Sequence, residues 1–205
     1  MLLEWSAVRD WKGNALAEPI AARFYSADVL LRNGSMIHIR AIRPDDKQRL
    51  LELFHSLSDQ SVYYRFFSPK KELSPAELDF LTELDFVQRV ALAAVVPRDP
   101  EAASYGSDEE RIIGVARYAV QGEDRAEVAY AVADAHHGRG IGSALLRHLA
   151  AVARAAGLTT FVANVLVENV AAQRAFLAHS GFHPTVTAVH GVAHLSFPLG
   201  AAEHG

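Results

Sequence analysis

A glycine-rich turn is the feature of this sequence that points most directly to chemistry. It reads His137-Gly138-Arg139-Gly140-Ile141-Gly142-Ser143, follows an apolar run and precedes a helical pattern. Glycines let the backbone turn sharply and leave its N–H groups unshielded. Those N–H groups, together with the positive end of a helix dipole, bind phosphate oxygens. The spacing therefore predicts a phosphorylated cofactor at a strand-to-helix turn.

Two common phosphate-binding motifs do not fit this turn. A P-loop needs a lysine after its last glycine, and none follows here. The dinucleotide pattern G-x-G-x-x-G fails because its last position falls on Ser143 or Leu145, depending on the starting glycine. It also needs an acidic residue about 20 positions further on, where this chain has Phe161-Val162-Ala163. Neither type of loop is expected.

A carboxylate precedes the turn in the sequence. Glu127 stands at the head of the apolar strand, ten residues before His137. A carboxylate can act as a general base, because it can accept a proton in a reaction. The alternative is a solvated carboxylate at a strand end. Glu123 and Asp124, in the preceding turn, are weaker candidates for the same role.

Other catalytic patterns are missing from the sequence. There is no cysteine, which excludes disulfides, thiolate nucleophiles and cysteine-based zinc sites. Neither H-E-x-x-H nor G-x-S-x-G occurs. His190 and His194 have the spacing of metal ligands, but no aspartate or cysteine lies near them in the sequence. No metal is expected.

Composition narrows the class of protein. The chain has 205 residues, half of them hydrophobic, which favours one globular domain. A net charge of −4 argues against nucleic-acid binding and is compatible with a cationic substrate. No apolar stretch approaches the roughly 18 residues of a membrane span. Charges in the first residues argue against a secretion signal, so a cytoplasmic protein is expected.

Periodicity and turn residues predict the elements that position these groups. Asn33-Gly34 lies between two apolar runs and predicts a hairpin. Ser74, followed by Pro75 and Glu77, predicts the start of a helix. Further helices are expected over residues 44–57, 59–67, 141–156 and 169–180, and strands over 90–96, 111–120, 125–133, 160–167, 185–189 and 192–197. Residues 97–110, which are polar and acidic, are expected to form a surface loop.

The residues from His137 to Gly142 resemble the acetyl-CoA loop [QR]-x-x-G-x-[GA] of the GNAT acetyltransferase superfamily. His137 stands where the family usually has Gln or Arg. A second family motif is matched by Asn169, Ala172 and Phe176, followed by Gly181-Phe182, one residue later than usual. The resemblance implies an α/β (α+β) GNAT fold, with a mixed, mostly antiparallel central sheet of about 6–7 strands flanked by helices on both faces.

The resemblance also implies roles for individual residues. Glu127 would be the catalytic base, and the thioester would lie near the backbone of Val132 and Ala133. The pyrophosphate would contact the backbone from Gly138 to Ser143, with the Arg139 side chain as a helper. Asn169 would reach the pantetheine arm or cap the following helix. Phe176 is expected at the cofactor, in the position where many members have a catalytic tyrosine, so no general acid is assigned. Tyr130 points, by strand alternation, to the face opposite Glu127 and is expected in the core.

The first half of the chain is similar to a narrower group. Ile39–Asp46, Tyr64–Ser68 and Leu81-Thr82 resemble bacterial protein-lysine acetyltransferases that act on acyl-CoA synthetases. This implies an N-acetyltransferase that uses acetyl-CoA and acetylates a primary amine, such as a protein lysine on an acyl-CoA synthetase. The alternatives are a small-molecule amine acetyltransferase and a catalytically weak acyl-CoA-binding regulatory module.

The same reading divides the chain into segments. Residues 1–27 are expected to be an extension of uncertain order, residues 28–200 a single GNAT domain and residues 201–205 a tail. Acetyl-CoA and an amine acceptor are the expected partners, without nucleic acid or membrane. The sequence does not decide between a monomer and a homodimer.

Overall fold

The computed structural model describes residues 22–98, 110–177 and 185–200. Most of the expected extension 1–27, most of the loop 97–110, the Gly181-Phe182 pair and the tail 201–205 lie outside them. None of the described helices is long and apolar enough to cross a membrane.

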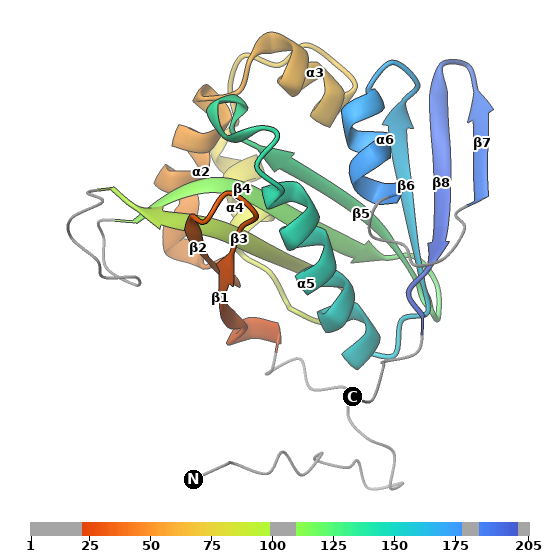
Figure 1. Ribbon diagram of the computed structural model, residues 1–205, viewed down its shortest axis with the longest axis horizontal. Coiled ribbons are helices and arrows are strands. Elements are labelled where there is room, and N and C mark those ends of the chain that lie inside the picture. Colours follow the sequence, from red (N-terminus) through yellow and green to blue (C-terminus); the bar gives the residue numbers. More distant parts are fainter. Residues whose placement is uncertain (1–21, 99–109, 178–184, 201–205) are drawn as a thin grey trace, which may run out of the picture.

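An open sheet of eight strands forms the centre of the structure (Figure 1). Along the sheet, the strand order is β1-β2-β3-β4-β5-β6-β8-β7. The bounds are β1 (Ser26–Leu30), β2 (Met36–Ala41), β3 (Arg89–Pro97), β4 (Glu110–Val120), β5 (Arg125–Val132), β6 (Thr160–Leu166), β7 (Thr185–Val189) and β8 (Val192–Pro198). The mixed, mostly antiparallel fold is confirmed. The sheet has eight strands where the resemblance implies about 6–7, and these eight correspond to the hairpin and the six further strands predicted from turns and periodicity.

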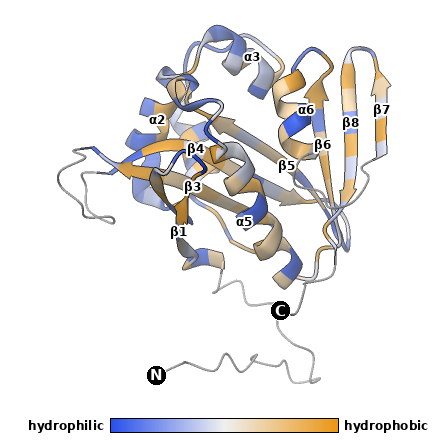
Figure 2. Ribbon diagram, viewed as in Figure 1, coloured by the Kyte–Doolittle hydropathy of each residue, from blue (hydrophilic) through white to orange (hydrophobic). Residues whose placement is uncertain are grey.

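Helices cover both faces of the sheet, as expected. Their bounds are α2 (Lys47–His55), α3 (Asp59–Phe66), α4 (Pro75–Thr82), α5 (Ile141–Ala155) and α6 (Val170–Leu177), with short 3-10 turns η1 (Pro44–Asp46) and η2 (Asp134–His136). Helices α5 and α6 lie on one face, and α2, α3 and α4 on the other (Figure 1). The central strands β3 and β4 between them are mostly hydrophobic (Figure 2).

Local sequence signals explain several element boundaries. The Ser74 hydroxyl accepts from the Glu77 N–H, and the Glu77 carboxylate accepts from the Ser74 N–H at 2.9 Å, so the predicted capping box is confirmed. Gly34 turns the first hairpin with φ +82°. The first strand of that hairpin, β1, begins at Ser26 and ends at Leu30.

A buried ion cluster joins β2, η1 and the start of β4. The Arg40 guanidinium donates to both oxygens of Asp46 at 2.7 Å and to Glu110 at 2.9 Å. Arg43 also donates to Glu110, at 2.7 Å. Burial alone would raise the pKa of Asp46, but the Arg40 hydrogen bonds and charge lower it overall. The cluster fixes the first hairpin to the end of β4 that lies beside the C-terminal end of β5.

The strands β5 and β6 pair in parallel over a short distance only. Their register joins Arg125 with Thr160, Ala126 with Phe161 and Glu127 with Val162, and it ends there. Beyond Glu127 the two strands diverge, while β5 stays paired with β4 as far as Val132. One edge of β5 is therefore left without a strand partner over its second half, and this divergence positions the site described next.

Candidate functional site

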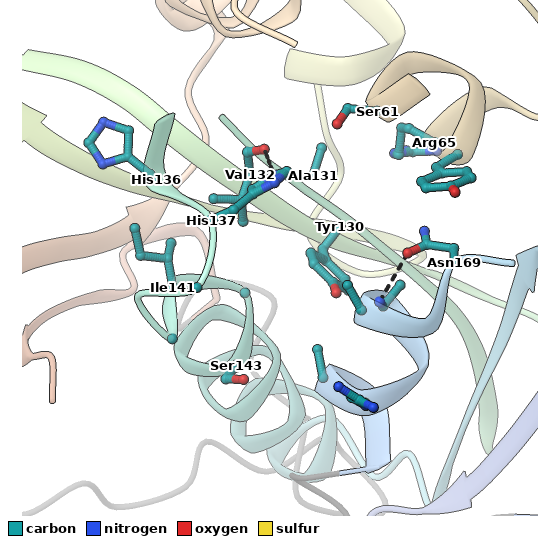
Figure 3. Close-up of a pocket in the computed structure, with 18 of the residues that line it drawn as sticks. Ser61, Arg65, Tyr130, Ala131, Val132, His136, His137, Ile141, Ser143 and Asn169 are labelled. Carbon is teal, nitrogen blue, oxygen red and sulfur yellow. Dashed lines mark hydrogen bonds between the residues drawn. The ribbon is translucent and has the colours of Figure 1, made fainter. Parts of the chain in front are cut away.

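A cavity of about 430 Å³ lies at the C-terminal end of β5, between the start of α5 and the start of α6 (Figure 3). The glycine-rich turn, residues of β5, the first turns of α6 and the α3 side chains Ser61, Tyr64 and Arg65 line it. Tyr130 lies on the α5 face of the sheet, and Ala131 lies on the α3 face. Because both line the cavity, it is reached from both faces of the sheet.

The three alternating glycines serve two different purposes. Gly138 and Gly140 have φ of +74° and +84°, a left-handed conformation that other residues rarely adopt. Gly142 has no such constraint, but a Cβ built there would lie 2.8 Å from the Tyr130 ring carbon Cε2. The turn therefore needs glycine at two positions for its backbone and at the third for its packing.

The start of α5 presents free donors to the cavity. The first helical bond runs from the Ala144 N–H to the Gly140 carbonyl at 2.9 Å, so the N–H groups of Ile141, Gly142 and Ser143 have no partner within the helix. These residues line the cavity. The arrangement suits the phosphate oxygens of a cofactor, as the sequence predicted.

The free edge of β5 offers a further donor. The Ala133 N–H donates to the Ile113 carbonyl on β4 at 2.9 Å. Because N–H directions alternate along a strand, the Val132 N–H points the other way, to the side from which β6 has diverged. The Val132 carbonyl on that side accepts from His137 Nε2 at 2.8 Å (Figure 3). Of the two predicted residues, Val132 lines the cavity and Ala133 does not.

Most of the other residues predicted to bind the cofactor line the cavity. His137, Gly138, Gly140, Ile141, Gly142, Ser143 and Asn169 line the cavity. Arg139 does not, because its guanidinium turns back to the Ala135 carbonyl at 3.0 Å. The Asn169 side chain accepts from the Ala172 N–H at 3.1 Å, so it caps α6 and borders the cavity at once (Figure 3).

Phe176 lies beneath the cavity instead of lining it. Its ring is only 4 % exposed and packs against Tyr130 and Phe197, with ring centroids 5.4 and 5.6 Å apart. Phe176 was expected to contact the cofactor, but it is not among the described residues that line the cavity. Its side chain supports Tyr130, which forms part of the cavity wall.

Several cavity residues were not predicted from the sequence. Tyr130 was assigned to the core; it packs against the core and also lines the cavity, and burial raises its pKa to about 12. Arg65 lines the cavity from α3; burial lowers its pKa, and the charge of Glu127 opposes that shift. His136 also lines it, and its pKa is lowered by burial and by the charges of Arg139 and Arg111. Only the proximity of His136 to the glycine turn could have identified it.

Glu127 lies outside the cavity, at the last paired position of β5 and β6. Its side chain is half-buried and lies on the sheet face that carries α3, together with Ala131. Asn164 donates to Oε1 at 2.9 Å and Gln121 donates to Oε2 at 2.7 Å. Its electrostatic interaction with Arg65 connects it to the cavity wall.

No three His, Asp or Glu side chains lie close enough together to bind a metal ion among residues 22–98, 110–177 and 185–200. His190 occupies a turn with φ +49°, and His194 bonds to Asn164. Neither takes part in a ligand set there.

Comparison with known proteins decides the family. A family model described as "Acetyltransferase (GNAT) family" matches residues 62–182, more than half of the chain. The chain belongs to the GNAT family of acetyltransferases.

Relatives and solved structures agree with this assignment. Acetyltransferase Pat of Mycolicibacterium smegmatis is 32 % identical over 161 residues, which are 76 % of this GNAT chain and 44 % of that protein. The crystal structure of the GNAT domain of S. lividans PAT is 39 % identical with a TM-score of 0.73, covering 84 % of this chain and 96 % of that one. This chain spans less than two thirds of the length of the curated relatives it matches.

A more distant structure shows the same fold. The Salmonella typhimurium protein yncA was solved with its cofactor acetyl-CoA and is 21 % identical, with a TM-score of 0.59 over 82 % of this GNAT chain and 95 % of that chain.

Gly140→Glu should abolish cofactor-induced stabilisation, because it places bulk and negative charge where phosphate oxygens would bind. In the wild type, acetyl-CoA at a hundredfold excess over its Kd should stabilise the fold by about 2.7 kcal/mol, seen as a rise in Tm. Gly157→Glu is the matched control, since Gly157 has the same φ of +84° at the far end of α5. An equal rise in Tm for both variants would contradict the phosphate assignment.

Acetyl-CoA should bind more tightly as the pH falls from 8 to 6. Burial and the charges of Arg139 and Arg111 lower the pKa of His136, which favours its neutral form in the free protein. A nearby polyphosphate favours the protonated form, so binding takes up a proton. Calorimetry in buffers of different ionisation enthalpy measures that uptake. His136→Gln should flatten the pH dependence, whereas His55→Gln, at the exposed end of α2, should not. A flat wild-type profile would rule out this role.

Proposed function

We propose that this protein transfers the acetyl group of acetyl-CoA directly to a primary amine, with a protein lysine as the acceptor. The observation that supports this best is the cavity at the β5–β6 divergence. Phosphate-binding donors line it on one face of the sheet, and Glu127 lies just outside it on the other face, beside the lining residue Arg65. A cofactor entering from the α5 side can thus meet an acceptor arriving from the α3 side.

The residues of the cavity fit acetyl-CoA. The N–H groups from Ile141 to Ser143 and the flanking glycines would hold the pyrophosphate, and the free edge of β5 would hold the pantetheine arm. The cofactor supplies an acetyl group activated as a thioester. The Val132 N–H faces the divergence and is fixed in advance, so it would stabilise negative charge on the thioester oxygen.

Glu127 would supply the base. An alkyl amine has a pKa of about 10.4, so at neutral pH it must lose a proton before its nitrogen can attack. Glu127 would accept that proton, and the nitrogen would then bond to the acetyl carbon. As the carbon–sulfur bond breaks and the thiolate leaves, the nitrogen would give up its second proton through water to the thiolate. Phe176 has no proton to give, and therefore water is the proton source we propose for the thiolate.

The acceptor assignment rests on the α2–α4 face. The segment Tyr64–Ser68 resembles protein-lysine acetyltransferases, and Tyr64 and Arg65 from it border the cavity. The relatives named Pat and PAT are 32 % and 39 % identical. Glu110 was expected in an acidic surface loop over residues 97–110, but it is fully buried in ion pairs with Arg40 and Arg43 and offers no charge to a cationic acceptor.

One observation favours a second candidate. The Arg65 guanidinium lines the cavity and faces the charge of Glu127. A cation at this place suits an amine that also carries a carboxylate, as an amino acid does. A small-molecule amine acetyltransferase is therefore the second candidate for the same site.

Glu127→Gln should keep the affinity for acetyl-CoA and lose at least about 100-fold in kcat/KM at pH 7, as expected when a general base is removed. Part of the rate should return at pH 9, because a larger share of the amine is then deprotonated without help. Steady-state kinetics from pH 6 to 10 measure both effects. Wild-type rates across this range would leave Glu127 as a strand-end carboxylate without a catalytic role.

A competition assay should identify the acceptor class. We expect an acyl-CoA synthetase to be acetylated on lysine with a higher kcat/KM than polyamines, aminoglycosides or amino acids. Each acceptor is compared at low and high salt, because charge steering weakens with ionic strength. A small amine preferred by tenfold or more would favour the second candidate. The absence of acetyl-CoA turnover with every acceptor would instead favour a binding module.

A further inference from the structure

A chain of hydrogen bonds that crosses three strands ends on Glu127. Asn164 of β6 donates from Nδ2 to Glu127 Oε1 at 2.9 Å. Asn164 Oδ1 in turn bonds to Nδ1 of His194 on β8, at 2.6 Å. Asn164 and His194 are directly opposite one another in the β6–β8 register, and both are exposed. The chain therefore runs over the surface of the sheet from β8 to the base.

The chemistry of the groups fixes the direction of each bond. A carboxylate only accepts, so Asn164 must turn its amide N–H₂ to Glu127 and its oxygen to His194. That oxygen also only accepts, so the proton of the short bond must lie on His194 Nδ1. The carboxylate thus fixes which way round the Asn164 amide sits, and the donating Nδ1–H of His194 holds the amide in that orientation against Glu127.

The position of the chain in the sheet is also informative. Glu127 and Val162 form the last parallel pair of β5 and β6. Asn164 is the next β6 residue on the same face, beyond the point where backbone pairing has stopped. Its side-chain bond to Glu127 therefore spans the divergence where main-chain bonds no longer do.

The Glu127 carboxylate stays able to take a proton in this arrangement. Gln121 donates to its second oxygen at 2.7 Å, so each oxygen has one amide donor. A carboxylate oxygen can accept about two hydrogen bonds, and therefore each keeps one direction for an amine or a water. The charged group that faces it from the packed helices is Arg65 of α3.

We propose that Asn164 and His194 are positioning residues that orient the Glu127 carboxylate towards the incoming amine. This inference rests on the proposed function, in which Glu127 is the base. Neither residue touches the cofactor cavity, so each acts through Glu127 alone.

The test uses the full chain and four single variants. His194→Leu and Asn164→Ala should each lower kcat about tenfold, the size expected for losing a hydrogen bond to a charged group. The Kd for acetyl-CoA should change less than twofold, and Tm should hardly change because both side chains are exposed. His194→Gln can still donate to Asn164 Oδ1 and should recover most of the rate. Ser196→Ala, two residues along the same strand and face, is the control and should behave as wild type.

A double-mutant cycle separates positioning from a general structural effect. In a Glu127→Gln background, measured at pH 9, His194→Leu should cause no further loss, because the group it orients has been replaced. The same tenfold loss in that background, or no loss in the wild-type background, would overturn the proposal. A Glu127→Gln variant with wild-type kinetics would overturn the base assignment itself, and the positioning role with it.

Discussion

The site depends on one constraint, which is that β5 and β6 stop pairing after Glu127 and Val162. A sheet that stayed paired would bury the β5 edge and leave no passage between its faces. Because the strands separate, the Val132 N–H has no strand partner and the cavity opens beside it. The helices α5 and α6 begin on either side of this opening, and so their N-terminal donors and caps meet there.

Side chains keep the divergence open. The Tyr130 ring lies between Gly142 at the start of α5 and Phe176 on α6, and Phe176 rests on Phe197 of β8. On the other side, Asp134 of η2 accepts from the backbone N–H of Ser58 at the start of α3. Aromatic packing on one face and a polar contact on the other therefore fix both walls of the cavity independently of any ligand.

The sequence was sufficient for features that are local along the chain. The Asn33-Gly34 turn, the Ser74 capping box and the glycine turn before α5 were all predicted, because each depends on residues a few positions apart.

Contacts between distant segments were harder to predict from the sequence. Arg139 was expected to help bind the cofactor, but its direction depends on the Ala135 carbonyl, which sequence spacing does not reveal. Strand alternation placed Tyr130 opposite Glu127 correctly, yet could not show that β6 would leave Tyr130 beside an opening. His194 stood out only for a metal-like spacing, whereas its partner is Asn164, 30 residues away.

The contact between Gly142 and Tyr130 has a consequence for how this protein can change over evolutionary time. A methyl group at position 142 would clash with the ring, so alanine there is acceptable only after the aromatic side chain at 130 has become smaller. Shrinking that ring first removes support from Phe176. Each single step is unfavourable while the pair of changes is tolerable, so the two positions are expected to covary among descendants of this sequence although they lie on different elements.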